Sequence, residues 1–449
     1  MSLNSTPSSE RIHIGFFGMR NAGKSSLVNA VTGQELSVVS DVQGTTTDPV
    51  KKAMELLPLG PVVIIDTPGI DDEGELGEKR IKKAQETLAK IDIAVLVTDA
   101  KKGLGGPDRE LIGLFEERNL PYIIAYTKAD LLEDSASHDE SLLLEGKGTE
   151  HMPDKEKAFR VNTGSERAAD DKNDHPVNKV IAHADNAENV ILVSAKTGEN
   201  IDLLKEKLGA FAGKLKTGKK LVADLLSPGD MVVLVIPIDE SAPKGRLILP
   251  QQQVMRDVLD SHCSFVACQD TDLKETLASL SKKPRLVITD SQAFGRVSKN
   301  TPDDILLTSF SILFARYKGS LETLVRGAAK LSKLKDGDKV LISEGCTHHR
   351  QCNDIGTVKM PGWIEQFSGV KPEYVFSSGN GFPDDLSEFA LIVHCGGCML
   401  NEKEMQYRIA RANEAGIPIV NYGVAIAEMH GILRRSLEVF PEILEILNS

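Results

Sequence analysis

The chain has 449 residues, more than one growing hydrophobic core normally accommodates, so two or three domains are expected. Hydrophobic residues make up 41% of the sequence and the formal net charge is −12, which fits a soluble globular protein and argues against broad affinity for nucleic acid or an anionic membrane. The six cysteines are too few for a disulfide scaffold, and because the N-terminal sequence resembles neither a signal peptide nor a membrane span, we expect a cytoplasmic protein.

Short apolar runs alternate with helical stretches from Arg11 to about Gly213, a pattern typical of a doubly wound, mostly parallel sheet. We therefore expect a first α/β domain over residues 8–216. A polar insertion at 132–189 interrupts the pattern. Strands are expected at Ile12 to Phe17, Pro61 to Asp66, Ile91 to Thr98, Leu120 to Tyr126 and Val190 to Val193.

The first expected strand is followed by GMRNAGKSS and then by a helical stretch, which is the context of a phosphate-binding loop. Gly18 and Gly23 let backbone amides turn towards phosphate oxygens. Lys24 would reach the β and γ phosphates, and the Ser25 hydroxyl would ligate Mg²⁺. The loop residues expected to contact a nucleotide are Gly18, Asn21, Ala22, Gly23, Lys24, Ser25 and Ser26.

Three later segments complete the expected nucleotide site. Asp66-Thr67-Pro68-Gly69 follows a strand, as a Walker B element does, so Asp66 would hold Mg²⁺ through water and Gly69 would lie near the γ phosphate. Thr127-Lys128-Ala129-Asp130 and Ser194-Ala195-Lys196 resemble the guanine-reading motifs of small GTPases, which favours GTP over ATP. The first of these motifs usually begins with Asn. The residues expected to read the base are Thr127, Lys128, Asp130, Ser194, Ala195 and Lys196.

Gly44-Thr45-Thr46-Thr47-Asp48 resembles the switch segment of the GTPases that modify tRNA and assemble ribosomes, with Thr46 at the Mg²⁺-ligating position. Thr45 and Thr47 are alternatives for this role. The same group uses a loop asparagine, matched by Asn21, to coordinate an activating potassium ion. Position 70 is Ile rather than a water-orienting Gln, so we expect slow hydrolysis and a regulated switch. The expected catalytic residues are Lys24, Thr46, Asp66 and Gly69.

After Leu221 the alternation predicts a small α/β domain over 222–300 and a third α/β domain over 301–449. We expect the small domain to mediate dimerisation, because an exposed edge of a sheet containing the apolar strand Met231 to Ile238 would invite aggregation. The other strands are expected at Ser264 to Cys268, Arg285 to Thr289, Lys339 to Ser343, Tyr374 to Phe376, Phe389 to Val393 and Ile417 to Asn421, and the helices at Gln251 to Ser261, Asp272 to Ser281, Ser320 to Lys333 and Glu402 to Ala415.

Two cysteine segments, Cys346-Thr347-His348 and His394-Cys395-Gly396-Gly397-Cys398, each follow an expected strand. If those strands are parallel neighbours, their carboxyl ends would bring the two segments together at one site. Soft thiolates select zinc, Cu(I) or iron–sulfur clusters, and from the residues alone a structural zinc site is the first choice. We interpret Cys352 as a bystander and both Cys263 and Cys268 as small core residues.

The succession of a GTPase domain, Cys346-x-His348 and His394-Cys395-x-x-Cys398 resembles the FeFe-hydrogenase maturation GTPases, the HydF family, over nearly the whole chain. The resemblance implies a 4Fe-4S cluster held by Cys346, Cys395 and Cys398, with His348 and His394 as alternatives for an exchangeable fourth ligand. It further implies a dimeric scaffold that carries a diiron precursor cluster to the hydrogenase. The implied cofactors are GTP, Mg²⁺, potassium and the 4Fe-4S cluster, and the implied partners are the FeFe-hydrogenase apo-protein and the radical SAM maturases that build the diiron unit.

Two other functions stay open at this point. The chain could be a ribosome-associated or tRNA-modifying GTPase with a zinc-stabilised C-terminal domain, although its acidic charge argues against that role. A plain dimerising GTPase switch would leave Cys346, Cys395 and Cys398 without a task. Iron with acid-labile sulfide would support the scaffold, and zinc would support the ribosomal alternative. The sequence does not specify how GTP is coupled to the cluster, what the insertion does, or which histidine binds.

Overall fold

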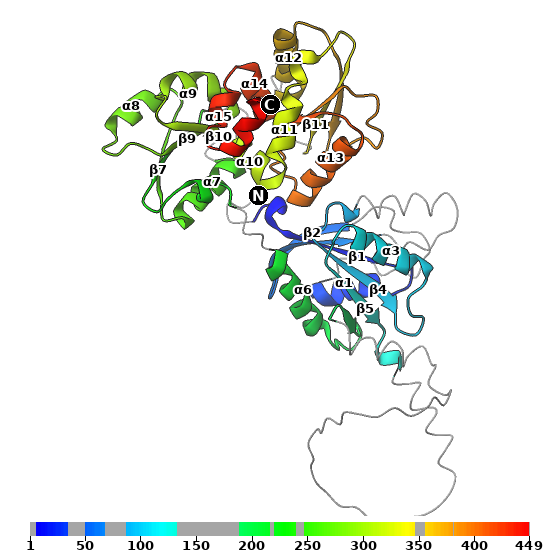
Figure 1. The fold of residues 1–449 in the computed structure, drawn as a ribbon. Helices are drawn as coiled ribbons and strands as arrows, with labels where there is room; N and C mark the ends of the chain where they lie inside the picture. Colours follow the sequence, from blue (N-terminus) through cyan, green and yellow to red (C-terminus); the bar gives the residue numbers. More distant parts are fainter. Residues whose placement is uncertain are drawn as a thin grey trace, which may run out of the picture. The chain divides into compact units, whose positions relative to one another are not determined.

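The computed structural model describes residues 6–34, 50–67, 87–132, 188–215, 220–238, 247–345, 355–379 and 381–448 (Figure 1). The chain forms two compact units, one comprising Arg11–Lys216 and the other Met1–Glu10 together with Thr217–Ser449. Ser8–Glu10, a short 3-10 helix, therefore belongs with the C-terminal unit, although the sequence suggested a first domain from residue 8. None of the described helices is long and apolar enough to cross a membrane.

In the unit Arg11–Lys216, the described strands form one sheet in the order β2-β3-β1-β4-β5-β6. All neighbours run parallel except β2, which is antiparallel to β3. The mostly parallel sheet confirms the predicted fold class, but β2 was not predicted. The strands are β1 (Ile12–Gly18), β2 (Val50–Leu56), β3 (Gly60–Asp66), β4 (Ile93–Asp99), β5 (Tyr122–Thr127) and β6 (Val190–Leu192), and the helices are α1 (Lys24–Thr32), α3 (Gly106–Glu117) and α6 (Ile201–Leu215).

Helices cover both faces of this sheet, as Figure 1 shows. Successive strand residues point to opposite sides, so each face contributes to a core of its own. Phe16 belongs to the core that contains the apolar residues of α1 and α6, whereas Phe17 belongs to the core that contains those of α3. The carboxyl ends of the parallel strands therefore meet at one edge, and the nucleotide motifs follow β1, β3 and β5 there. Most of the insertion predicted at 132–189 lies outside the described residues.

The C-terminal unit contains two parallel sheets, with strand orders β10-β9-β7-β8 and β12-β11-β13-β14 in its described part. Strand β10 pairs with β9, so the first of these sheets extends past residue 300, where the sequence suggested a domain boundary. The strands are β7 (Met231–Val235), β8 (Ser264–Cys268), β9 (Leu286–Thr289), β10 (Leu306–Ser309), β11 (Lys339–Glu344), β12 (Glu373–Ser378), β13 (Leu391–His394) and β14 (Ile419–Asn421).

One hydrophobic core runs through both C-terminal sheets. Helix α10 joins them, since it packs against α7 beside one sheet and against α13 and α14 beside the other. Ser309 caps this helix by accepting a hydrogen bond from the Ile312 amide at 3.2 Å. The helices are α7 (Leu249–Asp260), α8 (Leu273–Ser279), α9 (Phe294–Asn300), α10 (Phe310–Lys318), α11 (Leu321–Ala328), α12 (Met360–Ser368), α13 (Glu402–Glu414), α14 (Tyr422–Met429), α15 (Leu433–Ser436) and α16 (Pro441–Leu444).

Candidate functional site

The loop between β1 and α1 has the backbone of a phosphate cradle. Gly18 lies so close to β4 that an added Cβ would sit 2.1 Å from the Val97 carbonyl oxygen, so a side chain is excluded there. Asn21 and Gly23 both adopt positive φ, at 60° and 86°, and Gly23 is the N-cap of α1. The amides of the first turn of α1 thus follow a glycine-bounded turn, an arrangement that fits nucleotide phosphates.

Three of the predicted phosphate and magnesium residues converge at this loop. Lys24 Nζ forms an ion pair with Asp66 Oδ1, and Ser25 Oγ donates to Asp66 Oδ2 at 3.3 Å. Asp66 ends β3 and is only 8% exposed. A lysine, a hydroxyl and a carboxylate at the end of a phosphate loop fit a magnesium-bound nucleotide. Thr46 and Gly69, also predicted for this site, lie outside the described residues.

Thr127 and Lys128 tie the predicted base-reading segment to the phosphate loop. Thr127 Oγ1 donates to the Ala22 carbonyl at 2.5 Å and lies 3.1 Å from the Thr98 carbonyl, so a threonine at this position connects the loop to β4. Lys128 Nζ donates to the Asn21 carbonyl at 2.9 Å. The hydroxyl that replaces the usual asparagine amide is therefore engaged by backbone oxygens.

Asp99, at the end of β4, is a residue that the sequence analysis missed. Its carboxylate accepts a hydrogen bond from Lys128 Nζ at 2.7 Å and from the Lys101 amide at 2.9 Å. Burial opposes its ionisation, but these two groups outweigh that effect and lower the pKa of Asp99. The signal in the sequence was its place after a buried strand, where carboxylates commonly serve a site.

The carboxylate predicted to read the base, Asp130, is held by residues that follow β6. Asp130 Oδ1 accepts from Ser194 Oγ at 2.8 Å, and Asp130 Oδ2 lies 3.8 Å from Lys196 Nζ. The two predicted segments, which are 64 residues apart, thus meet at one point. Such a fixed carboxylate can accept hydrogen bonds from a guanine edge.

In the C-terminal unit, β11 and β13 are parallel neighbours, which meets the condition under which the two cysteine segments come together. Ser343 aligns with His394, and the Cys395 amide donates to the Ser343 carbonyl at 2.9 Å. The Gly345 amide donates to Cys395 Sγ at 3.0 Å, and the Gly397 amide donates to it at 3.4 Å. The residue that precedes Cys346 is therefore hydrogen-bonded to the sulfur of Cys395. Cys346, His348 and Cys352 lie outside the described residues.

Of the four described cysteines, Cys395 and Cys398 lie together in one loop, and two such thiols fit a soft metal centre. Cys395 and Cys398 are both half-buried, and neither is in a disulfide. The amide hydrogen bonds to Cys395 Sγ would stabilise negative charge on this sulfur if it binds a metal. Burial raises the pKa of Cys398, an effect that Lys318 partly offsets. Within the described stretches no group of three His, Cys, Asp or Glu residues could hold a metal ion.

His394 does not have the environment expected of a metal ligand. It is fully buried, its Nδ1 lies 2.7 Å from the Cys395 carbonyl, and its Nε2 lies 3.0 Å from Arg408 Nη1. Arginine only donates, so Nε2 accepts and Nδ1 carries the proton. Burial, followed by the Arg408 charge, lowers the pKa of His394 to about 3. Both ring nitrogens are thus engaged inside the domain, which argues against His394 as the iron ligand among the two alternatives.

Arg408 and Lys318 are two buried cations that were not expected from the sequence. Both lie beside residues 395–400, which we call the cysteine loop. Arg408 forms a buried ion pair with Glu404 at 2.8 Å and also donates to the Gly379 carbonyl at 2.7 Å. Lys318 Nζ donates to the carbonyls of Cys398 and Leu400, and burial lowers its pKa to about 8. A lysine at the end of a helix is normally solvated, so the sequence around Lys318 does not indicate that this side chain is buried.

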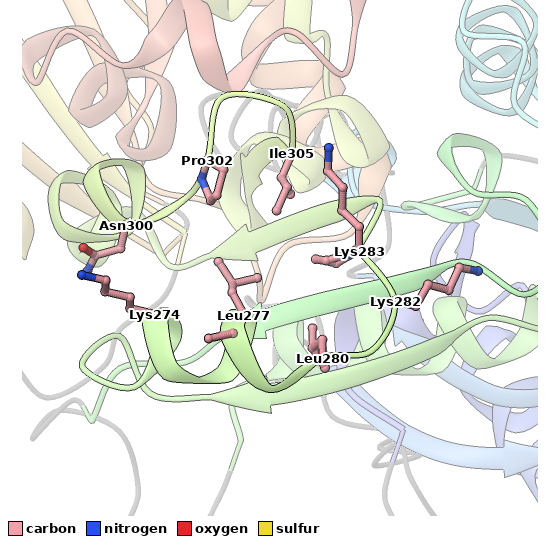
Figure 2. Close-up of a pocket in the computed structure, with 10 residues that line it drawn as sticks. Lys274, Leu277, Leu280, Lys282, Lys283, Asn300, Pro302 and Ile305 are labelled. Carbon is pink, nitrogen blue, oxygen red and sulfur yellow. The ribbon is translucent and has the colours of Figure 1, made fainter.

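A cavity of about 450 Å³ lies beside α8, as Figure 2 shows. Two of its lysines are engaged elsewhere, since Lys282 Nζ donates to the Gly229 carbonyl and Lys283 Nζ to Asp304. Its lining contains no carboxylate, histidine or thiol that could catalyse a reaction. The lining residues are Lys274, Leu277, Ala278, Leu280, Lys282, Lys283, Pro284, Asn300, Pro302 and Ile305.

Three stretches of the chain match known protein families. Residues 13–128 match a 50S ribosome-binding GTPase family. Residues 221–319 match the hydrogen maturase F dimerization domain, and residues 322–439 match the hydrogen maturase F tetramerization domain. The three matches follow one another in the order of the sheets described above.

Similarity to individual proteins is concentrated in the GTPase part. The chain is 35% identical over 139 residues to GTPase Der of Kosmotoga olearia, covering 30% of this chain and 31% of that protein. It is 42% identical over 123 residues to GTPase Der of Wolinella succinogenes, covering 27% of this chain and 26% of that protein. The chain therefore spans less than a third of the length of these curated relatives.

Solved structures also resemble the chain in part. Era of Aquifex aeolicus, bound to GDP and aluminium fluoride, is 17% identical with a TM-score of 0.32, over 65% of this chain and 99% of that chain. The G domain of the FeoB iron transporter of T. maritima is 20% identical with a TM-score of 0.26, over 45% of this chain and 99% of that chain.

Proposed function

Because the chain belongs to the hydrogen maturase F family, we propose that it is a GTP-hydrolysing scaffold that holds a 4Fe-4S cluster and assembles or delivers the diiron precursor of the FeFe-hydrogenase active site. Its partners would be the FeFe-hydrogenase apo-protein, the radical SAM maturases that build the diiron unit, and further copies of itself. The observation that carries this proposal is the hydrogen bond from the Gly345 amide to Cys395 Sγ. Both residues lie in the segment that matches the hydrogen maturase F tetramerization domain.

In the GTPase domain, the residues present would hold the nucleotide and its magnesium ion. Lys24 would place its ammonium at the β and γ phosphates, with Ser25 and Asp66 beside the Mg²⁺. Thr46 would complete the magnesium site and Gly69 would contact the γ phosphate. We further propose that Asn21 helps to bind an activating potassium ion. Hydrolysis would be slow, because Ile70 cannot orient water as a glutamine does.

The cluster would be held by Cys395, Cys398 and Cys346. Chain connectivity supports the third ligand, because Cys346 follows directly on Gly345, whose amide contacts Cys395 Sγ. When bound, the cluster supplies one iron with an exchangeable coordination position. His394 keeps neither ring nitrogen for that position, so we assign it to His348 or to an exogenous ligand.

Iron and acid-labile sulfide in the anaerobically reconstituted full-length chain test the proposal. We expect Cys346→Ser, Cys395→Ser and Cys398→Ser each to lose most of the iron and to fail in activating apo-hydrogenase in a reconstituted maturation assay. Cys268→Ser is the matched control, because Cys268 is also a free, half-buried cysteine of the same unit but lies in β8. The GTPase activity of all four variants should stay unchanged, because the GTPase domain has cores of its own.

Zinc in place of iron, or full iron retention in all three cysteine variants, would overturn the scaffold function. The first result would instead favour a GTPase with a zinc-stabilised domain. The absorption spectrum distinguishes the two metals, because thiolate-bound iron absorbs visible light and zinc does not.

A further inference from the structure

Lys318, the last residue of α10, is a buried cation placed against the cysteine loop. Only 3% of it is exposed. Its Nζ donates to the Leu400 carbonyl at 2.9 Å and to the Cys398 carbonyl at 3.3 Å, and it lies 5.5 Å from the centroid of the Phe314 ring. Within the described residues, no carboxylate forms an ion pair with this ammonium group. Its hydrogen bonds go to the turn that carries Cys398.

Burying an ammonium group is energetically costly, and two carbonyl dipoles offset only part of that cost. The ionisable groups that face Lys318 are the thiols of Cys398 and Cys395 and the carboxylates of Glu10 and Glu402, of which Cys398 acts most strongly. Cysteine thiols become anionic when they bind a metal. Metal-bound cysteines would therefore add negative charge beside this ammonium group, next to the carboxylates of Glu10 and Glu402.

We propose that Lys318 is a positioning residue and counter-charge for the cluster, fixing the Cys398 to Leu400 turn through its carbonyl oxygens and offsetting the negative charge of the cysteine ligands. This inference rests on the proposed iron–sulfur function. A fixed positive charge close to the cluster would stabilise its reduced, more negative state and so raise its reduction potential.

The position of Lys318 also joins two domains. It lies within the match to the dimerization domain, which ends at residue 319, whereas the cysteine loop lies within the match to the tetramerization domain. Helices α10 and α13 approach so closely after Lys318 that a Cβ on Gly319 would sit 3.0 Å from Ile409 Cδ1. The positive charge is thus supplied by the last residue of α10, within the match to the dimerization domain, and not by a side chain of the cysteine loop.

The test compares the midpoint reduction potential and the iron content of the reconstituted full-length chain with those of three variants. Lys318→Met removes the charge and the hydrogen bonds, Lys318→Gln keeps a donor without the charge, and Lys318→Arg keeps the charge. The control is Lys339→Met. Lys339 is a partly exposed lysine at the end of β11 away from Gly345, and it pairs with Glu388 at 2.7 Å. Potentials are read by redox titration followed by electron paramagnetic resonance.

We expect a more negative potential in Lys318→Gln, the same shift with reduced iron content in Lys318→Met, and recovery towards the wild-type potential in Lys318→Arg. Lys339→Met should match the wild type. If Lys318→Met does not fold, Lys318→Gln alone decides the question of charge. Wild-type potential and iron content in both neutral variants would overturn the role of Lys318. Absence of iron from the wild-type chain would instead overturn the proposed function on which it rests.

Discussion

Replacing Arg408 by Met tests how much the polar network behind the cysteine loop stabilises the C-terminal unit. The side chains of Arg408 and Glu404 are only 1% and 6% exposed, and the guanidinium also donates to His394 Nε2. Removing one partner of a buried ion pair costs about 3–5 kcal/mol, because the other charge stays buried without compensation. We expect Arg408→Met to lower the free energy of unfolding by that amount, a large part of the stability of an ordinary domain.

The chain offers a matched control in Arg326→Met. Arg326 and Glu322 form a pair with the same spacing of four residues along a helix, but their side chains are 58% and 53% exposed. A surface pair of this kind contributes about 0.3–0.5 kcal/mol. The difference between the two variants therefore isolates the effect of burial from that of charge and spacing.

Urea unfolding followed by tryptophan fluorescence measures both variants. The single tryptophan of the chain, Trp363, lies in α12 and is partly buried against the C-terminal core, so its emission reports on this unit alone. Similar small losses for Arg408→Met and Arg326→Met would refute the reasoning. The double variant Glu404→Met with Arg408→Met should regain much of the lost stability, since no lone charge stays buried.

Three further outcomes are expected. Lys24→Ala should abolish GTP hydrolysis without reducing iron content, as iron analysis and phosphate release would show, because the two sites lie in units with separate cores. Asp130→Asn should weaken GTP binding by roughly 1.5–3 kcal/mol in a titration, since a charged acceptor is lost. The Asp224 side chain is 46% exposed, and its partial desolvation opposes ionisation, but the bidentate hydrogen bonds from Arg316 outweigh that effect and lower the pKa of Asp224. The stability that Asp224 adds, reduced by solvent screening, should therefore be present above the unfolded pKa of about 3.9 and disappear as pH falls through the folded pKa. Urea unfolding of Asp224→Asn should therefore differ from wild type at pH 7 and match it in acid.

Much of the nucleotide site could be predicted from the sequence, because its signals are local. A strand, a glycine loop and a helix in succession specify the phosphate cradle without reference to the rest of the chain. The meeting of Gly345 with Cys395 was also predictable, since parallel neighbours bring their carboxyl ends together. Edge strand β2 was not predicted, because its sequence VKKAMEL carries two charged lysines and a glutamate where an apolar run was sought.

What the sequence could not provide depends on burial and on partners distant in the chain. His394 looked like a ligand because histidine often is one, but its imidazole is committed to Arg408, which reaches it from α13. Lys318 lies 80 residues from Cys398, and nothing in its neighbours reveals that α10 ends inside the protein. Strand β10 was not predicted, because a strand of four residues, LLTS, is too short to show an alternation of apolar and polar residues.

The separate cores of the two units bear on how such a chain could arise. The described apolar residues that the GTPase sheet buries all lie within Arg11–Lys216, so a gene segment encoding this unit would bring its own core. The two C-terminal sheets share one interior and would have to be inherited together. This agrees with the similarity to GTPase Der, which covers 30% of the chain or less, and predicts that the GTPase domain can be exchanged for a homologous one while the C-terminal pair cannot be divided.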